Sequence, residues 1–234
     1  MKYTSEIVKL RENNFLNIVN TLSFNEFFFE QIIKILKPND KILDIGTGNG
    51  YILSELQKRV LNIKLDFFGV DISKSMIEQA RSLTSTILFK IASNYNLPFS
   101  NNYFDIITSK NVTNFDANEL FRVLKNDGFV IFREYGEGKG LIEVSNLFSN
   151  RLINSRSIEN YINEFKEAGF TLFFSQSFII KRRFKTIDEI INTIKSFSYV
   201  KNFSDNDIDL IKQKLNNLEI TSDPFLIILK KEKK

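Results

Sequence analysis

The residues of clearest chemical interest form a glycine-rich stretch at positions 44–50, with the sequence DIGTGNG. A short apolar run precedes it, and a helical pattern follows at about 51–59. In an open α/β sheet, such a turn lies at the carboxyl edge of the first strand, where ligands bind. Glycine lets the backbone approach a ligand closely, and the next helix N-terminus offers free N–H groups to a negative group.

A carboxylate ends the next predicted strand. Asp71 lies 21 residues after Gly50, the spacing at which a carboxylate can accept hydrogen bonds from both hydroxyls of a ribose. The alternative role for Asp71 is that of a helix N-cap. Together, the glycine turn and Asp71 predict a nucleotide-like ligand.

The chain contains neither His nor Cys. This absence excludes a Ser-His-Asp or Cys-His nucleophile, a zinc site with nitrogen and sulfur ligands, a disulfide and a thiol redox centre. We therefore predict no metal site. Any chemistry must use carboxylates, lysine, tyrosine, hydroxyls, amides, backbone groups or a bound cofactor.

The composition is that of a globular protein. Of the 234 residues, 43% are apolar and 26% charged, and 32 basic residues face 28 acidic ones, a net charge of +4. The most basic segments are 181–185 and 230–234, and we expect both to be solvated surface rather than a nucleic-acid site. No stretch approaches about 20 uninterrupted apolar residues, and the first residues lack the apolar core of a signal peptide. We expect a cytoplasmic protein without a membrane span.

Strands and helices alternate in the first 135 residues. After an initial helix that stops before Pro38, we expect strands at about 41–45, 65–70, 86–91, 104–109 and 129–134, with helices at about 51–59, 74–83 and 117–125. This alternation predicts right-handed βαβ units and a parallel sheet covered on both faces.

The pattern loosens after residue 135. Glycines at 136, 138 and 140 predict a mobile loop or hinge, and a helix ends at Gly169, where a left-handed cap favours glycine. A strand-like stretch at 170–180 and a last strand at 225–229 enclose two amphipathic segments at about 186–218. That helical pair could close over an active site or simply thicken the core.

The glycine spacing distinguishes between ligand classes. A dinucleotide fingerprint that begins at Gly46 requires glycine at position 51, where the chain has Tyr51. The observed spacing, with an acidic residue two positions before the first glycine, resembles motif I of the class I S-adenosyl-L-methionine (SAM)-dependent methyltransferases. Three later segments also resemble motifs of that family: NLPFSNNYFDII at 96–107, FRVLKNDG at 121–128 and AGF at 168–170. The likeness is greatest to the subgroup that includes the ubiquinone and menaquinone methyltransferases.

The resemblance implies an α/β fold, a Rossmann-like seven-stranded, mostly parallel sheet with helices on both faces and an added helical cap region. We predict a single methyltransferase domain over 1–234. Within it we expect an N-terminal helical region at 1–37, a SAM-binding core at 38–135 and a substrate-side region at 136–234, whose helical insertion spans about 186–218.

The resemblance also implies a set of cofactor residues. The glycine turn would cradle the methionine portion of SAM, Asp71 would hold the ribose, and Ile72 would pack on the adenine. Many relatives carry an Asp-Ala pair where this chain has Ser93 and Asn94, so an amide, a hydroxyl or the backbone would replace the carboxylate near the adenine amino group. The predicted cofactor-binding residues are Asp44, Gly46, Thr47, Gly48, Gly50, Asp71, Ile72, Ser93, Asn94, Ser109 and Lys110.

Methyl transfer from a sulfonium needs mainly alignment of the nucleophile, the methyl carbon and the sulfur. An amine need only lose its proton, whereas an alcohol needs a positioned base. The candidate bases are Glu134, Tyr135 and Lys110. Tyr3 and Tyr51 are further candidates for closing over SAM.

We therefore expect a SAM-dependent methyltransferase that transfers a methyl group to a small-molecule acceptor, releases S-adenosyl-L-homocysteine and favours an amine. The alternatives are O- or C-methylation of a quinone-like or natural-product substrate, and a SAM-binding partner subunit without catalysis. A nicotinamide dehydrogenase is a third reading, disfavoured by the glycine spacing. The sequence leaves the acceptor and the oligomeric state open.

Overall fold

A computed structural model describes residues 21–197 and 200–233 of the chain. These residues form two compact units. The first, here called the sheet unit, comprises residues 27–134, 159–176 and 226–233; the second, here called the appended unit, comprises the described residues within 21–26, 135–158 and 177–225. Position Tyr3 lies outside the described residues.

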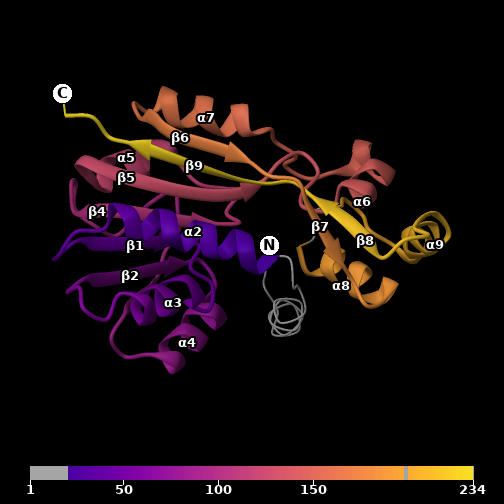
Figure 1. Cartoon of the computed structure of the whole chain (residues 1–234), viewed down its shortest axis with the longest axis horizontal. Coiled ribbons are helices and arrows are strands. Elements are labelled where there is room, and N and C mark those ends of the chain that lie inside the picture. The colour runs from indigo at the N-terminus through magenta and orange to yellow at the C-terminus, as the bar shows by residue number, and fades with distance from the viewer. Residues whose placement is uncertain (1–20, 198–199, 234) are drawn as a thin grey trace. The chain divides into compact units, whose positions relative to one another are not determined.

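The main sheet has seven strands in the order β3-β2-β1-β4-β5-β9-β6 (Figure 1). β1 pairs in parallel with β2 and β4, β2 with β3, and β4 with β5. In Figure 1 the arrow of β9 points opposite to those of β5 and β6. The strands are β1 (Lys41–Ile45), β2 (Asp66–Asp71), β3 (Leu88–Ile91), β4 (Phe104–Lys110), β5 (Leu124–Tyr135), β6 (Thr171–Ser177) and β9 (Pro224–Lys230). This sheet confirms the predicted Rossmann-like fold class.

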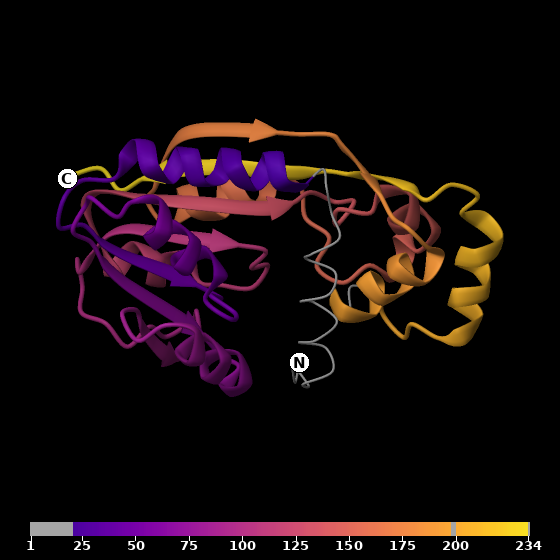
Figure 2. The same ribbon diagram turned by 60° about the horizontal axis from the view of Figure 1, so that its bottom comes forward.

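Helices lie on both sides of this sheet, and α2 runs along its strands (Figure 2). Phe165 of α7 packs edge-on against Phe132 of β5, with ring centroids 5.4 Å apart. Ser73 caps α4, because its hydroxyl accepts a hydrogen bond from the Met76 N–H. The helices of this part are α2 (Thr21–Ile35), α3 (Tyr51–Arg59), α4 (Lys74–Leu83), α5 (Ala117–Val123) and α7 (Ile158–Glu167).

Two of the predicted strands differ from the observed ones. The strand expected at 129–134 begins earlier, because β5 starts at Leu124. The extended stretch at 170–180 is interrupted: β6 ends at Ser177, and a separate strand, β7 (Ile180–Arg183), follows in a two-stranded antiparallel sheet with β8 (Glu219–Ser222). The apolar run alone does not show where the chain leaves one sheet for another.

Arg122 joins the two family-like segments at 96–107 and 121–128 in space. Its guanidinium donates to the carbonyls of Leu97 (3.0 Å) and Phe99 (2.8 Å). Glu119, one turn earlier on α5, accepts two hydrogen bonds from Arg122 and one from the Leu97 N–H. Arg122 and Glu119 therefore hold the loop before β4 against α5, a structural role.

Asp105 joins β4 to its neighbours in a similar way. Its two carboxylate oxygens each lie 2.8 Å from Lys125 Nζ, and Oδ2 also accepts from the Lys41 N–H at the start of β1. Asp127 in the following turn has a positive φ of 63°. Aspartate tolerates this conformation, so the turn forms without the Pro-Gly of the family pattern.

Lys231 corrects the expectation that the whole basic tail is solvated. Its side chain is buried, and its Nζ donates to Asn102 Oδ1 (2.8 Å) and to the carbonyls of Phe121 (2.7 Å) and Leu124 (2.8 Å). The ammonium also lies 4.4 Å from the centroid of the Phe121 ring, a cation–π contact. Lys231 therefore satisfies the carbonyls at the end of α5.

Replacing Lys231 with Met is expected to lower the free energy of unfolding by about 2 to 4 kcal/mol, because two carbonyls and an amide lose their donor. The matched control is Lys230→Met. Lys230 pairs with Asp127 (3.0 Å) and Glu232 (3.2 Å) at the surface, and loss of such pairs costs about 1 kcal/mol or less. Urea denaturation of both variants measures the difference, and equal costs would contradict the role of Lys231.

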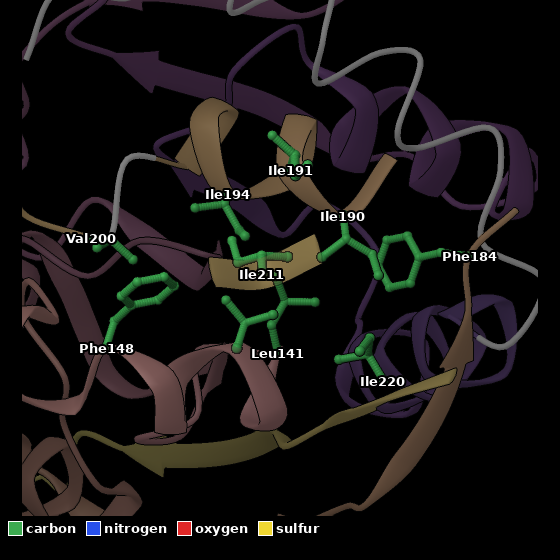
Figure 3. Packing of buried hydrophobic residues seen from close by; sticks show 10 residues of the cluster. Leu141, Phe148, Phe184, Ile190, Ile191, Ile194, Val200, Ile211 and Ile220 are labelled. Carbon is green, nitrogen blue, oxygen red and sulfur yellow. The ribbon is translucent and has the colours of Figure 1, made fainter. Parts of the chain in front are cut away.

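The appended unit has a hydrophobic core of its own (Figure 3). Ile190, Ile191 and Ile194 of α8 pack with Ile211 of α9 in this core. The predicted helical pair at 186–218 corresponds to α8 and α9; its role as a cap stays a prediction. The remaining elements of this unit are α6 (Ile142–Leu147), η1 (Ser149–Arg151), α8 (Ile187–Phe197) and α9 (Asp205–Lys214), together with β7 and β8.

Asp223 organises the glycine loop at 136–140 in the appended unit. Its carboxylate accepts from the N–H groups of Gly138 (2.7 Å) and Gly140 (2.8 Å), and its carbonyl accepts from the Gly136 N–H (3.0 Å). A side chain at Gly138 would meet Asp223 Oδ2 at 2.9 Å. The glycines predicted to form a hinge thus allow the loop to close tightly around one carboxylate.

Candidate functional site

The glycine turn between β1 and α3 uses the left-handed conformation at three alternate positions. The φ angles of Gly46, Gly48 and Gly50 are 59°, 56° and 79°. A Cβ added at Gly46 would lie 2.4 Å from Val112, and one added at Gly50 would lie 2.7 Å from Phe89, whereas one at Gly48 would meet nothing within 4 Å. The outer glycines are therefore required by packing, and the middle glycine opens onto free space that a ligand can fill.

Asp71 supports this turn directly. Its Oδ2 accepts from the Gly48 N–H (2.9 Å), and its Oδ1 accepts from the N–H of Ser73 (2.8 Å) at the start of α4. Each carboxylate oxygen has a second lone pair for a further donor. The side chain thus combines a local structural role with the capacity to accept ribose hydroxyls, the role predicted from its spacing.

Asp44 is buried at the end of β1. Thr108, its register neighbour on β4, donates its hydroxyl to Asp44 Oδ1 at 2.7 Å. Burial raises the pKa of Asp44 to about 7, and the charge of Asp71 acts in the same direction. The hydroxyls of Thr108 and Thr47 and the charge of Lys110 oppose this shift. A ligand that brings positive charge to Asp44 would favour its ionised form.

Lys110 ends β4 near Asp44. Burial and the nearby charge of Arg133 lower the pKa of Lys110 well below its usual value, and Asp44 acts in the opposite direction. The ammonium lies 5.2 Å from the centroid of the Tyr51 ring, a cation–π contact. Arg133 in turn donates to Asn111 Oδ1. Two basic groups and one carboxylate therefore meet beside the glycine turn.

The predicted adenine side carries an apolar surface and an amide. Ile72, directly after Asp71, leaves 68% of its side chain exposed beside the turn. Asn94 Oδ1 is a buried atom without a hydrogen-bond partner among the described residues, while its Nδ2 lies 3.5 Å from the Asn114 carbonyl. Ser93 accepts from the Tyr95 N–H and so shapes this turn. An apolar face and an unused amide acceptor match the two recognition surfaces of an adenine ring.

These observations fit the predicted cofactor. The space at Gly48, the buried carboxylate of Asp44 and the free acceptor of Asn94 suit a ligand with a cationic amino acid portion and an adenine. Across residues 21–197 and 200–233, no group of three or more Asp or Glu side chains could hold a metal ion, and no helix is long and apolar enough to cross a bilayer.

Comparison with known proteins decides the family. A family model described as a methyltransferase domain matches residues 36–169, more than half of the chain. The chain belongs to this methyltransferase domain family. The matched residues include the glycine turn, Asp71, Asn94 and Lys110, all of which lie in the sheet unit.

Named relatives and solved structures agree with the methyltransferase assignment. The ubiquinone/menaquinone biosynthesis C-methyltransferase UbiE of Geotalea daltonii is 30% identical over 136 residues, 52% of this chain and 57% of that protein. Phosphoethanolamine N-methyltransferase 1 of Arabidopsis thaliana is 29% identical over 152 residues, 58% of this chain and 30% of that protein. The chain spans about half the length, or less, of these curated relatives. The crystal structure of a putative methyltransferase from Bacillus halodurans C-125 has the same fold, with a TM-score of 0.66, 15% identity and coverage of 88% of this chain and 99% of that one.

The three candidate bases are not all brought together in the structure. Lys110 is in register with Arg133 on β5, and alternation along that strand directs Glu134 to the opposite face, the face of Phe132. Glu134 is buried and is the last residue of the sheet unit, whereas Tyr135 is the first of the appended unit. The catalytic roles of Glu134, Tyr135 and Lys110 stay predictions.

Ser109 is fully buried, and its hydroxyl has no hydrogen-bond partner among the described residues. It is in register with Phe132, so it shares the face of Glu134 rather than that of Lys110. Ser109 is one of the predicted cofactor-binding residues, and the register places its side chain on the other side of the sheet from Lys110.

Sequence reasoning missed Thr108 and Arg133, which set the electrostatics of Asp44 and Lys110. Their signal was present in the composition of the strands. Both are polar residues in otherwise apolar runs near a strand's carboxyl end, where an unexplained polar side chain indicates a site. The register between β1, β4 and β5 was needed to connect each with its partner.

Proposed function

We propose that this methyltransferase-family chain transfers a methyl group from SAM to a small-molecule acceptor. The observation that carries the proposal is the turn at 46–50, where two glycines are packed against Val112 and Phe89 and the middle one opens onto free space. A turn built only for packing has no need of a third left-handed glycine with an empty surface. When bound, SAM supplies an electrophilic methyl group on a sulfonium that leaves as a neutral thioether.

The residues of the chain would act mainly by positioning. Asp44 would place its carboxylate near the positive charge of the methionine portion, Asp71 would hold the ribose while it fixes Gly48, and Asn94 would accept from the adenine amino group. Holding the reacting groups in line can supply roughly 7 to 11 kcal/mol of the barrier. No histidine base is needed for an acceptor that reaches the site already deprotonated.

We infer that the acceptor is a small amine. The chain has no histidine, and an amine makes the smallest demand on a base because its proton can leave before methyl transfer. Sequence similarity to the Arabidopsis N-methyltransferase is compatible with this inference. C-methylation is the second candidate, favoured by the similarity to UbiE.

Methyl transfer is measured as S-adenosyl-L-homocysteine released with panels of amines, phenols and quinols. The expected result is turnover with at least one amine. Turnover confined to quinols would reject the amine acceptor in favour of C-methylation. SAM binding without turnover of any acceptor, including a cell extract, would support the non-catalytic SAM-binding subunit instead.

Glu134→Gln separates the acceptor classes. With an amine acceptor, we expect SAM affinity within about twofold of wild type and a modest loss of kcat, about tenfold or less. With an acceptor that loses its proton during the transfer, removal of the base would cost about 100- to 10,000-fold in kcat. Isothermal titration with SAM and the pH profile of kcat together measure both effects.

A further inference from the structure

Arg182 is a buried arginine within the appended unit. It lies on β7, where the side chains of Lys181 and Arg183 are exposed and that of Arg182 retains only 6% exposure. The segment 181–185 was expected to be solvated surface, and Arg182 corrects that expectation. Alternation along the strand explains the difference, since every second residue faces the interior.

The guanidinium of Arg182 has few partners. Its Nη1 lies 3.4 Å from the Gly140 carbonyl, a long hydrogen bond, and its Cζ lies 5.1 Å from the ring centroid of Phe184. Its Nε has no hydrogen-bond partner, and no carboxylate of the described residues lies within ion-pair distance. A guanidinium has five N–H donors, so most of its hydrogen-bonding capacity is unused.

Two other cations of this unit have carboxylate partners. Arg151 pairs with Asp207 at 2.5 Å, and Lys181 lies 3.9 Å from Glu143. Asp223 does not serve Arg182, because its two carboxylate oxygens accept from the N–H groups of the glycine loop. A buried charge without a counter-charge is costly, and it persists where an outside group supplies the opposite charge.

Arg182 contacts the glycine loop of its own unit. The Gly140 carbonyl that it contacts belongs to the loop fixed by Asp223. A Cβ added at Gly140 would meet the ring of Tyr135 at 2.8 Å. The contact partner of Arg182 is therefore held in place by two further residues of the appended unit.

We propose that Arg182 is the centre of an oxyanion-binding site that takes a carboxylate or phosphate group. The planar fork of arginine matches both groups with two parallel hydrogen bonds. The Phe184 ring, 5.1 Å from the guanidinium carbon, helps to keep the fork in place. This anion site does not depend on the proposed methyl transfer.

Inorganic phosphate tests the anion site on the full chain. At ten times its dissociation constant, phosphate is expected to raise the melting temperature of wild type by about 3 to 5 °C relative to sodium chloride of equal ionic strength. The same rise is expected in Arg183→Met, which removes an exposed arginine one residue away, and no rise in Arg182→Met. Without phosphate, Arg182→Met is expected to melt no lower than wild type, because it removes an unpaired buried charge.

Three results would overturn the anion site. They are the absence of any phosphate effect on wild type, an equal phosphate effect in Arg182→Met, and a melting temperature of phosphate-free Arg182→Met below that of phosphate-free wild type. If Arg182→Met does not fold, Arg182→Lys is expected to keep the fold and weaken phosphate binding by about tenfold, since an ammonium lacks the planar fork. Equal phosphate affinity of Arg182→Lys and wild type would then count against the proposal.

Discussion

Asp71→Ala is expected to weaken SAM binding by about 30- to 1000-fold. A carboxylate that accepts both ribose hydroxyls contributes charge-assisted hydrogen bonds, of which the loss of a pair costs about 2 to 4 kcal/mol. The substitution also deprives the N–H groups of Gly48 and Ser73 of their acceptor, so the turn that receives the ligand loses a support. Isothermal titration with SAM measures the change.

The matched control is Asp66→Ala. Asp66 begins the same strand that Asp71 ends, is exposed and lies at the opposite edge of the sheet. We expect its SAM affinity to stay within about twofold of wild type. Glu134→Gln should likewise affect SAM binding far less than Asp71→Ala does. If Asp71→Ala binds SAM as tightly as wild type does, the cofactor assignment is wrong.

Asp44→Asn is expected to change stability and cofactor binding in opposite directions. Because burial raises the pKa of Asp44 to about 7, the folded state holds a proton that the unfolded state releases near pH 4. The stability of the ligand-free wild type therefore falls as pH rises from about 4 to about 7. Above about pH 7 the carboxyl is ionised in both states, and its effect on stability no longer changes with pH. The upper limit of this effect is about 4 kcal/mol.

Asparagine keeps the shape of the side chain and can accept from Thr108 without carrying a charge. At pH 8 we expect Asp44→Asn to be more stable than wild type by about 1 to 3 kcal/mol, and near pH 4 to be equal to it. Urea denaturation at several pH values measures the difference between the two proteins. A difference that does not vary with pH would contradict the burial of a titrating carboxyl at this position.

SAM binding at pH 8 should favour wild type over Asp44→Asn, the reverse of the order in stability. A cationic ligand binds the ionised form of Asp44 more tightly, so the SAM affinity of wild type should rise with pH between about 6 and 8. We expect Asp44→Asn to bind SAM about tenfold or more weakly at pH 8 and to lack this pH dependence. Unchanged affinity at pH 8 would exclude Asp44 from the cofactor site.

The sheet unit was largely predictable because its signals are local. Alternating apolar runs and helical periodicity predicted β1, α3 and α4, and the spacing from the glycine turn predicted Asp71. The contacts of Arg122 and Asp105 show why such motifs are recognisable. Each motif holds together segments that must meet for the sheet to form.

Contacts between distant residues were not predictable. Lys231 and Arg182 belong to runs of basic residues, and only tertiary packing reveals that these two members are buried. The partnership of Asp44 with Thr108 depends on the register of two strands separated by 64 positions in the chain. The appended unit shows the same limit, because its two short strands pair across the segment 184–218, which contains α8 and α9.

Calorimetric titration of the wild-type chain with SAM, alongside an identical titration with NADH, tests the central claim most directly. The glycine turn, Asp44 and Asp71 predict saturable binding of one SAM per chain, with a dissociation constant between about 1 μM and 1 mM, and no saturable binding of NADH. Absence of saturable SAM binding, or binding of NADH that is tighter than that of SAM, would contradict the account.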